Sequence, residues 1–126
     1  MGEAKRILVV EDDDVARELM RRTLARRGYD VTTAGDGIEA YDLAVKTTPD
    51  LIVTDIHMPG ADGAHFVRRV RDTPGLLETP ILVTTGYGTG SATLTLSQGA
   101  DAFEPKPVDP ESLLRSVERL LSKAPR

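Results

Sequence analysis

Short apolar or β-branched runs alternate along this chain with longer segments in which apolar residues recur every three or four positions. Continuous apolar runs are typical of strands buried on both faces of a parallel sheet, whereas the longer period indicates amphipathic helices. The predicted strands cover residues 7–10, 31–34, 51–55, 81–85 and 102–104. Strand and helix therefore alternate five times, which predicts an α/β fold with a parallel sheet and helices on both faces.

Five helices are predicted from this pattern and from residues that favour helix ends. The first is expected to end at Gly28, because glycine adopts the left-handed conformation that closes many helices. Asp14, with Asp13 as a second candidate, would cap its start. The other four begin at Asp36, Gly63, Ser91 and Asp109 and end before Pro49, at about Asp72, at Gln98 and at about Leu121.

The segment from Gly86 to Gly99 carries conflicting signals. Residues 93–96 alternate as a strand does, and the glycines and threonines around them are poor helix formers. Neighbouring parallel strands, however, need a crossover of a dozen or more residues, which is usually helical. We therefore predict a short, marginal fourth helix over about 91–98.

Composition narrows the class of protein. The 126 residues suffice for one domain, with a core from about 6 to 121 and frayed termini. The formal net charge of −4 does not favour direct nucleic-acid binding, and the lack of cysteine excludes disulfides and cysteine-ligated zinc. The sequence has no signal-peptide pattern and no apolar run of membrane length, so we expect a cytoplasmic protein without a membrane partner.

Polar residues stand where the predicted strands end. They are Glu11 and Asp12 after the first strand, Asp55 and Thr85 at the ends of the third and fourth, and Lys106 after the fifth. Each alone has an ordinary explanation, such as a turn former for Asp55 or a solvated surface lysine for Lys106. Parallel strands, however, bring their carboxyl ends to one edge, where open α/β sheets bind ligands. Together these residues therefore predict a binding site.

The acids in this group favour a metal ion. Three carboxylates so close repel one another unless a cation joins them, and oxygen donors without His or Cys suit a hard ion such as Mg²⁺. Three acids, one Mg²⁺ and one lysine sum to zero charge, so an incoming phosphoryl group would meet little repulsion. The sequence therefore predicts a Mg²⁺ site for phosphoryl chemistry, with Mn²⁺ as a substitute ion.

From about Arg6 to Leu121, the chain resembles the receiver domains of two-component response regulators, single-domain chemotaxis regulators among them. The motifs that carry the resemblance are the two acids after residues 7–10, Asp55-Ile-His-Met-Pro-Gly-Ala-Asp-Gly63, Thr85, Gly99-Ala-Asp-Ala-Phe103 and Lys106-Pro107. The resemblance implies a flavodoxin-like, doubly wound five-stranded sheet with strand order 2-1-3-4-5. From Thr85 to Lys106 the spacing is one residue shorter than in common family members.

The resemblance also implies roles. Asp55 would accept a phosphoryl group from a sensor histidine kinase or a histidine phosphotransferase. Asp12 and Asp55 would bind Mg²⁺ directly, together with the backbone carbonyl of His57, and Glu11 would hold metal-bound water. The protein would not be an enzyme toward other substrates, because it would catalyse only its own aspartyl phosphorylation and dephosphorylation.

The switching residues follow from the same resemblance. Lys106 would pair with Asp55 at rest and with the phosphoryl oxygens afterwards, while Thr85 would donate its hydroxyl to them and pull its loop inward. Gly86 would leave room for the phosphoryl group, and Phe103 would turn from exposed to buried. The Lys106-Pro107 bond would be cis. A downstream protein that the sequence does not identify would recognise the switched surface, and the protein would be a monomer or a weak, phosphorylation-dependent dimer.

Two bulky residues and two alternatives complete the prediction. His57 and Tyr87 lie two positions beyond Asp55 and Thr85, where this family tunes the access of hydrolytic water, so we hypothesise a relatively long-lived phosphoaspartate. One alternative is a small phosphatase that passes through an aspartyl-phosphate, with His57 in place of its usual second acid. The other is a degenerate receiver that binds partners without phosphorylation. The chain would be either a stand-alone regulator or a piece of a longer protein.

Overall fold

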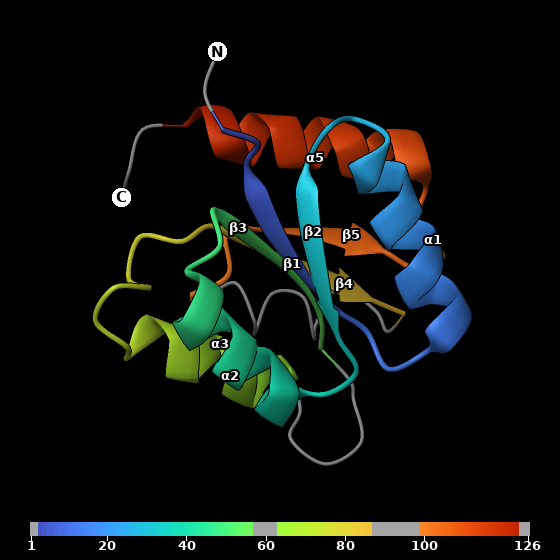
Figure 1. Cartoon of the computed structure of the whole chain (residues 1–126). Helices are drawn as coiled ribbons and strands as arrows, with labels where there is room; N and C mark the ends of the chain where they lie inside the picture. The colour runs from blue at the N-terminus through green and yellow to red at the C-terminus, as the bar shows by residue number, and fades with distance from the viewer. Residues whose placement is uncertain (1–2, 57–62, 87–98, 124–126) are drawn as a thin grey trace.

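One parallel sheet forms the centre of the molecule. The structure is a computed structural model that describes residues 3–56, 63–86 and 99–123. Its five strands lie in the order β2-β1-β3-β4-β5, and every neighbouring pair is parallel (Figure 1). The strands are β1 (Arg6–Val10), β2 (Asp30–Ala34), β3 (Leu51–Asp55), β4 (Ile81–Thr85) and β5 (Ala102–Pro105). The predicted sheet and the strand order implied by the resemblance are confirmed.

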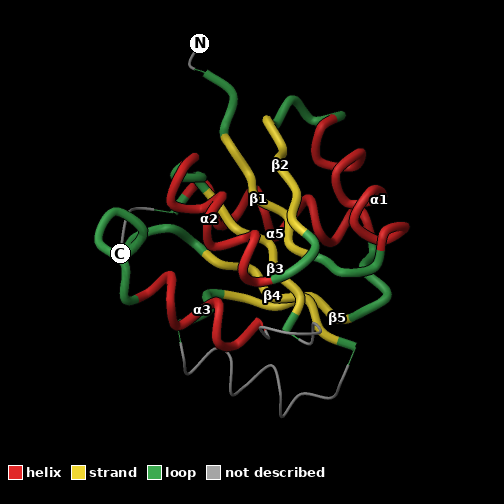
Figure 2. The backbone as a smooth tube through the Cα atoms, turned by 60° about the horizontal axis from the view of Figure 1, so that its bottom comes forward, coloured by secondary structure: helices red, strands yellow, loops and turns green. Residues whose placement is uncertain are grey.

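Helices cover both faces of this sheet. The part of the chain that the structure describes contains four: α1 (Asp14–Ala25), α2 (Gly37–Thr47), α3 (Gly63–Arg71) and α5 (Pro110–Ser122). The predicted helix over 91–98 lies outside the described residues. α1 and α5 cover one face and α2 and α3 the other, so that the strands lie between two helical layers (Figures 1 and 2).

Alternate strand residues supply two separate cores. Ile7 and Val9 of β1 point toward α1 and α5, where they pack with Leu24 and Val117. Leu8 and Val10 of the same strand point to the opposite face, into the core formed with α2 and α3. Because both faces of the strand are covered, all four of these β1 residues are fully buried, which explains the continuous apolar run in the sequence.

The ends of α1 differ from the prediction. Asp13, and not Asp14, is the cap, because its carboxylate accepts a hydrogen bond of 2.8 Å from the amide of Ala16. The helix ends at Ala25, and the chain then turns through Gly28, which has a φ of +89° and donates its N–H to the carbonyl of Ala25. Gly28 therefore closes the turn after the helix rather than the helix itself.

The later caps agree with the prediction. The carboxylate of Asp36 accepts a hydrogen bond from the amide of Glu39, and that of Asp109 accepts one from the amide of Ser112. Pro110 occupies the first turn of α5, where its missing N–H leaves no helical bond unmade. Among the described residues, no helix has the length and apolar character needed to cross a membrane.

Arg71 ties the end of α3 to the start of β5. Its guanidinium donates hydrogen bonds to the carbonyl of Gly99 at 2.9 Å and to the carboxylate of Asp101 at 2.9 Å. The same carboxylate oxygen of Asp101 accepts the amide of Ile81, so the entries to β4 and β5 are joined. Gly99 has a φ of +121°, and a Cβ there would lie 2.7 Å from Cγ of Arg71. Glycine is therefore required at this position.

Candidate functional site

A buried ion-pair cluster occupies the carboxyl edge of the sheet. Asp55 is the last residue of β3, Glu11 follows β1, and Lys106 follows β5. Nζ of Lys106 lies 2.8 Å from Oδ2 of Asp55 and 2.8 Å from Oε1 of Glu11. The two acids are 3% and 0% exposed, respectively. One ammonium group therefore joins two carboxylates that solvent barely reaches.

The strand pairing brings Lys106 to this position. Its backbone N–H donates a hydrogen bond of 2.8 Å to the carbonyl of Thr85, which extends the ladder between β4 and β5 by one residue. The Lys106–Pro107 peptide bond that follows is cis. Gly86 lies against the stem of the lysine, since a Cβ at position 86 would meet Cβ of Lys106 at 3.7 Å. Thr85 and Gly86 therefore border the lysine, and the side chain of Thr85 is buried.

The loop between β1 and α1 is held by backbone and side-chain bonds. The amide of Glu11 donates to the carbonyl of Ala34, and its carbonyl accepts a bond of 2.9 Å from Nη1 of Arg17. Its second carboxylate oxygen, Oε2, accepts the amide of Asp13 at 3.0 Å. Glu11 is therefore fixed through its backbone and through both carboxylate oxygens.

Burial and charge shift two pKa values within the cluster. Burial raises the pKa of Glu11, and nearby Asp55 adds to that rise, although Lys106 and the amide of Asp13 act in the opposite direction. For Lys106, burial on its own would lower the pKa, but the two carboxylates outweigh it and the pKa rises. At neutral pH the lysine therefore carries its charge.

The acids form a donor set that fits a divalent cation. Glu11, Asp12 and Asp55 each offer one carboxylate oxygen, and these oxygens lie within 4.8 Å of one another. Asp12 is exposed, so the group opens to solvent on its side. The charge of Lys106 offsets only one of the three carboxylates, which leaves two negative charges for a cation to balance. All donors are hard oxygens, as Mg²⁺ prefers.

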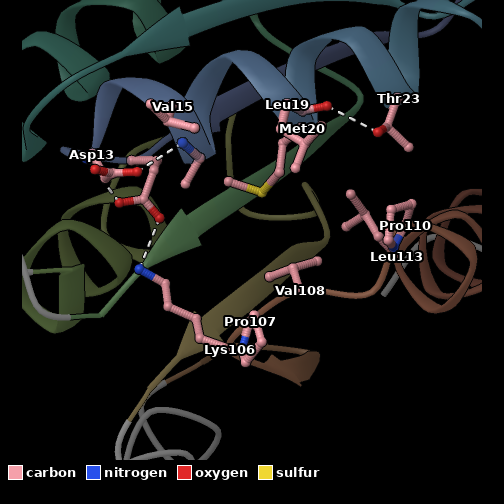
Figure 3. A pocket seen from close by; sticks show the side chains of 12 residues that line it. Asp13, Val15, Leu19, Met20, Thr23, Lys106, Pro107, Val108, Pro110 and Leu113 are labelled. Atoms are coloured by element: carbon pink, nitrogen blue, oxygen red, sulfur yellow. Dashed lines mark hydrogen bonds and ion pairs between the residues drawn. The ribbon is translucent and has the colours of Figure 1, made fainter.

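An apolar groove adjoins the cluster, between the first half of α1 and the start of α5. Its volume is about 240 Å³. Lys106, whose Nζ pairs with Glu11, lies at one end of the groove, and Met20 and Val108 are on its walls (Figure 3). Val15 and Leu19 of α1 line it and are exposed, although they are apolar. The groove therefore offers a hydrophobic surface next to Asp55 and its neighbours.

The structure brings most of the predicted site residues to one edge. Glu11, Asp12, Asp55 and Lys106 are in the cluster, and Thr85 and Gly86 border it, whereas Phe103 lies on β5 and is exposed. His57 and Tyr87 lie outside the described residues. Glu11, Asp12, Asp55, Thr85, Gly86 and Lys106 therefore lie together at the carboxyl edge of the sheet.

Two residues near the site had not been singled out from the sequence. Arg17 contacts the acid-bearing loop, and the only signal for it was its position three residues after Asp14, a spacing at which helical side chains meet. Glu104 is buried beside Phe103 and accepts hydrogen bonds from Ser112 at 2.6 Å and Ser116 at 2.5 Å. Both serines belong to α5, so nothing in the local sequence of β5 indicated these contacts.

Comparison with known proteins gives a consistent result. Residues 7–118 match the family model of the response regulator receiver domain. The response regulator MprA of Mycobacterium sp. strain KMS is 43% identical over 119 residues, which are 94% of this chain and 51% of MprA. The chain therefore spans about half the length of this curated relative.

Solved structures agree in fold. The chemotaxis response regulator CheY4 of Vibrio cholerae is 35% identical and has a TM-score of 0.87, with 93% of this chain and 98% of that chain covered. The receiver domain of the sensor histidine kinase PA1611 of Pseudomonas aeruginosa PAO1 is 29% identical and has a TM-score of 0.89, with 95% and 99% covered. That crystal structure has a magnesium ion coordinated in the active site cleft.

Proposed function

This chain belongs to the response regulator receiver domain family, and on that premise we propose that it is a phosphorylation switch whose phosphoryl acceptor is Asp55. The observation that carries the proposal is the buried carboxylate of Asp55, which pairs with Lys106 and lies within one donor group with Glu11 and Asp12. A nucleophile, a cation and a metal-binding acid pair at one sheet edge are the parts that phosphoryl transfer requires.

In the proposed reaction, a carboxylate oxygen of Asp55 attacks the phosphorus of a phosphohistidine on the donor protein. The P–O bond forms as the P–N bond breaks, and the imidazole of the donor leaves with the electron pair. Lys106, whose Nζ donates to Oδ2 of Asp55 at 2.8 Å, would exchange this oxygen for a phosphoryl oxygen. The Lys106 charge thereby stays paired throughout the transfer.

Glu11, Asp12 and Asp55 would hold the metal ion, which we propose to be Mg²⁺, with Mn²⁺ as a substitute. When bound, the ion supplies positive charge that offsets the charge of the transferring phosphoryl group. The hard oxygen donors and the two uncompensated negative charges support this assignment. The magnesium ion in the PA1611 receiver domain supports it as well.

Phosphorylation would switch a surface through the link between β4 and β5. Thr85 would donate its hydroxyl to the phosphoryl group, and its carbonyl already accepts the amide of Lys106. Phe103, three residues before Lys106 on the adjacent strand, is exposed and would become buried as the Thr85 loop moves inward. Phosphorylation would then shift the population between two arrangements of this edge, which a downstream protein distinguishes.

The phosphoryl donor would be a sensor histidine kinase or a histidine phosphotransferase. It has to bring a histidine to Asp55, and the apolar groove with Val15 and Leu19 is a surface beside the site that could dock one of its helices. We propose a cytoplasmic location, no direct contact with nucleic acid or membrane, and a monomer or a weak phosphorylation-dependent dimer. The protein's only catalytic activity would be its own phosphorylation and dephosphorylation.

Incubation with acetyl phosphate and Mg²⁺, followed by intact mass measurement, tests the proposal. The wild type should gain the mass of one phosphoryl group, whereas Asp55→Asn should gain none, and omission of Mg²⁺ should abolish the gain. Asp42→Asn, which changes an exposed acid of α2, is the matched control and should label like the wild type. Equal labelling of wild type and Asp55→Asn would refute Asp55 as the acceptor, whereas no labelling of the wild type would refute the proposal and favour a degenerate receiver.

A further inference from the structure

Arg17 of α1 contacts the loop that carries the proposed metal ligands, although it is not one of them. Its Nη1 donates a hydrogen bond of 2.9 Å to the carbonyl of Glu11, and its Nη2 forms an ion pair with the carboxylate of Asp14. The side chain is 25% exposed. The guanidinium therefore lies between the loop that carries Glu11 and Asp12 and the first turn of α1, and it bonds to both.

The hydrogen bond from Arg17 is made to the peptide that joins Glu11 and Asp12, two of the proposed metal ligands. The carbonyl of Glu11 belongs to the peptide that joins Glu11 to Asp12, so a rotation of this peptide would change how the two carboxylates lie relative to each other. The amide of Glu11 is fixed by the carbonyl of Ala34 on β2, and the carbonyl is fixed by Arg17. Asp12 itself is exposed, so packing does not hold it in place. Its direction depends on this peptide.

The neighbouring backbone leaves room for the guanidinium. A Cβ built on Gly35, just after β2, would lie 3.5 Å from Nη1 of Arg17. An alanine would fit at that distance, whereas a larger side chain at position 35 would extend toward the guanidinium. Arginine suits the place because its planar fork can donate to the Glu11 carbonyl and the Asp14 carboxylate at once, which a lysine ammonium on a flexible stem does less well.

We propose that Arg17 is a positioning residue of the metal site, which sets the orientation of the Glu11–Asp12 peptide and thereby the affinity for the divalent cation. The inference rests on the proposed function, because it assumes that the ion binds at Glu11, Asp12 and Asp55. Residues that orient metal ligands typically change metal affinity by about 10- to 100-fold when they are lost. Since Arg17 acts through a backbone carbonyl rather than on a ligand atom, we expect a smaller change, of about three- to tenfold.

The direct test is Mn²⁺ binding by the full chain, measured from the electron paramagnetic resonance signal of free Mn²⁺. Arg17→Gln should raise the dissociation constant by about three- to tenfold. The dissociation constant of Arg17→Lys should lie between those of the wild type and Arg17→Gln, because an ammonium group replaces only part of the contacts that the guanidinium makes. The matched control is Arg21→Gln, which removes a partly exposed arginine one turn later that pairs with Glu18 and should leave the affinity unchanged.

A second variant leaves Arg17 in the chain and separates affinity from folding. Gly35→Leu should displace the guanidinium and weaken Mn²⁺ binding, whereas Gly35→Ala should not, and circular dichroism should show all variants folded. In acetyl phosphate labelling, Arg17→Gln should need more Mg²⁺ for half-maximal rate but reach the wild-type rate at saturation. Equal Mn²⁺ affinity in Arg17→Gln and Arg21→Gln would overturn the role of Arg17 but leave the proposed metal site intact. A wild type that binds no Mn²⁺ would instead overturn the proposed metal site itself.

Discussion

Replacing Lys106 with methionine should destabilise the protein and make its stability depend on divalent cations. The change keeps most of the side-chain length but removes the charge that joins Glu11 and Asp55, which are 0% and 3% exposed. Breaking a buried ion pair by removing one partner typically costs about 3 to 5 kcal/mol, because the remaining charge stays buried without compensation. The lysine side chain is 29% exposed and the cluster opens to water at Asp12, so we expect the lower end, about 3 kcal/mol.

The same reasoning predicts how the loss can be reversed. Mg²⁺ and Lys106 neutralise the same carboxylates, so Mg²⁺ should stabilise Lys106→Met by more than it stabilises the wild type. Adding Asp55→Asn to Lys106→Met should also recover part of the loss, because it removes one of the unpaired charges. The two substitutions are in contact and should therefore not be additive.

Urea unfolding followed by far-ultraviolet circular dichroism, in chelator and in Mg²⁺, measures these differences. Lys46→Met, which removes an exposed lysine of α2, is the matched control and should change the free energy of unfolding little. Because the folded-state pKa of Lys106 is raised above its ordinary 10.5, its stabilising contribution is complete at neutral pH and is lost only as the pH rises through that higher value. A Lys106→Met protein as stable as the wild type in chelator, or one with no greater response to Mg²⁺, would refute the reasoning.

Three further predictions concern other parts of the chain. Gly99→Ala should lower the free energy of unfolding by about 1 to 3 kcal/mol, because a left-handed φ and a 2.7 Å approach to Arg71 both oppose a Cβ, whereas Gly86→Ala should be nearly neutral in thermal melts. Tyr87→Ala should accelerate dephosphorylation of the phosphorylated protein, and an unchanged decay rate would rule out shielding by this residue. Leu19→Asp should leave labelling by acetyl phosphate unchanged but slow transfer from a phosphorylated histidine phosphotransferase that labels the wild type; equal slowing of both would argue against a docking surface in the groove.

The sequence was sufficient to predict the acids and the lysine of the site. Asp55 ends β3 and Lys106 follows β5, and parallel strands bring their carboxyl ends to one edge whatever the order of the strands. That the strands are parallel followed from the alternation of strands and helices along the chain. The strand order itself came from the family resemblance, because no local pattern encodes which strand lies beside which.

The features that the sequence did not predict depend on side-chain direction and on distant partners. Asp13 and Asp14 are both acids that favour a helix start, and only the backbone conformation selects Asp13 as the cap. Arg17 is one of several arginines on α1, and its hydrogen bond to the backbone carbonyl of Glu11 distinguishes it from the others. Glu104 is in a brief strand whose pattern does not show that two serines in the first two turns of α5 will donate hydrogen bonds to it.

The ion pairs of Lys106 have a consequence for the folding of the chain while it is being synthesised. Glu11 follows β1, Asp55 ends β3, and the lysine follows β5, so the two ion pairs of Lys106 close loops of 51 residues to Asp55 and 95 residues to Glu11. During synthesis, Asp55 and Glu11 therefore cannot form their ion pairs with Lys106 until β5 has docked on the sheet. A chain in which β5 has not docked therefore lacks the complete site, so we expect a phosphoryl donor to label it less than the folded protein.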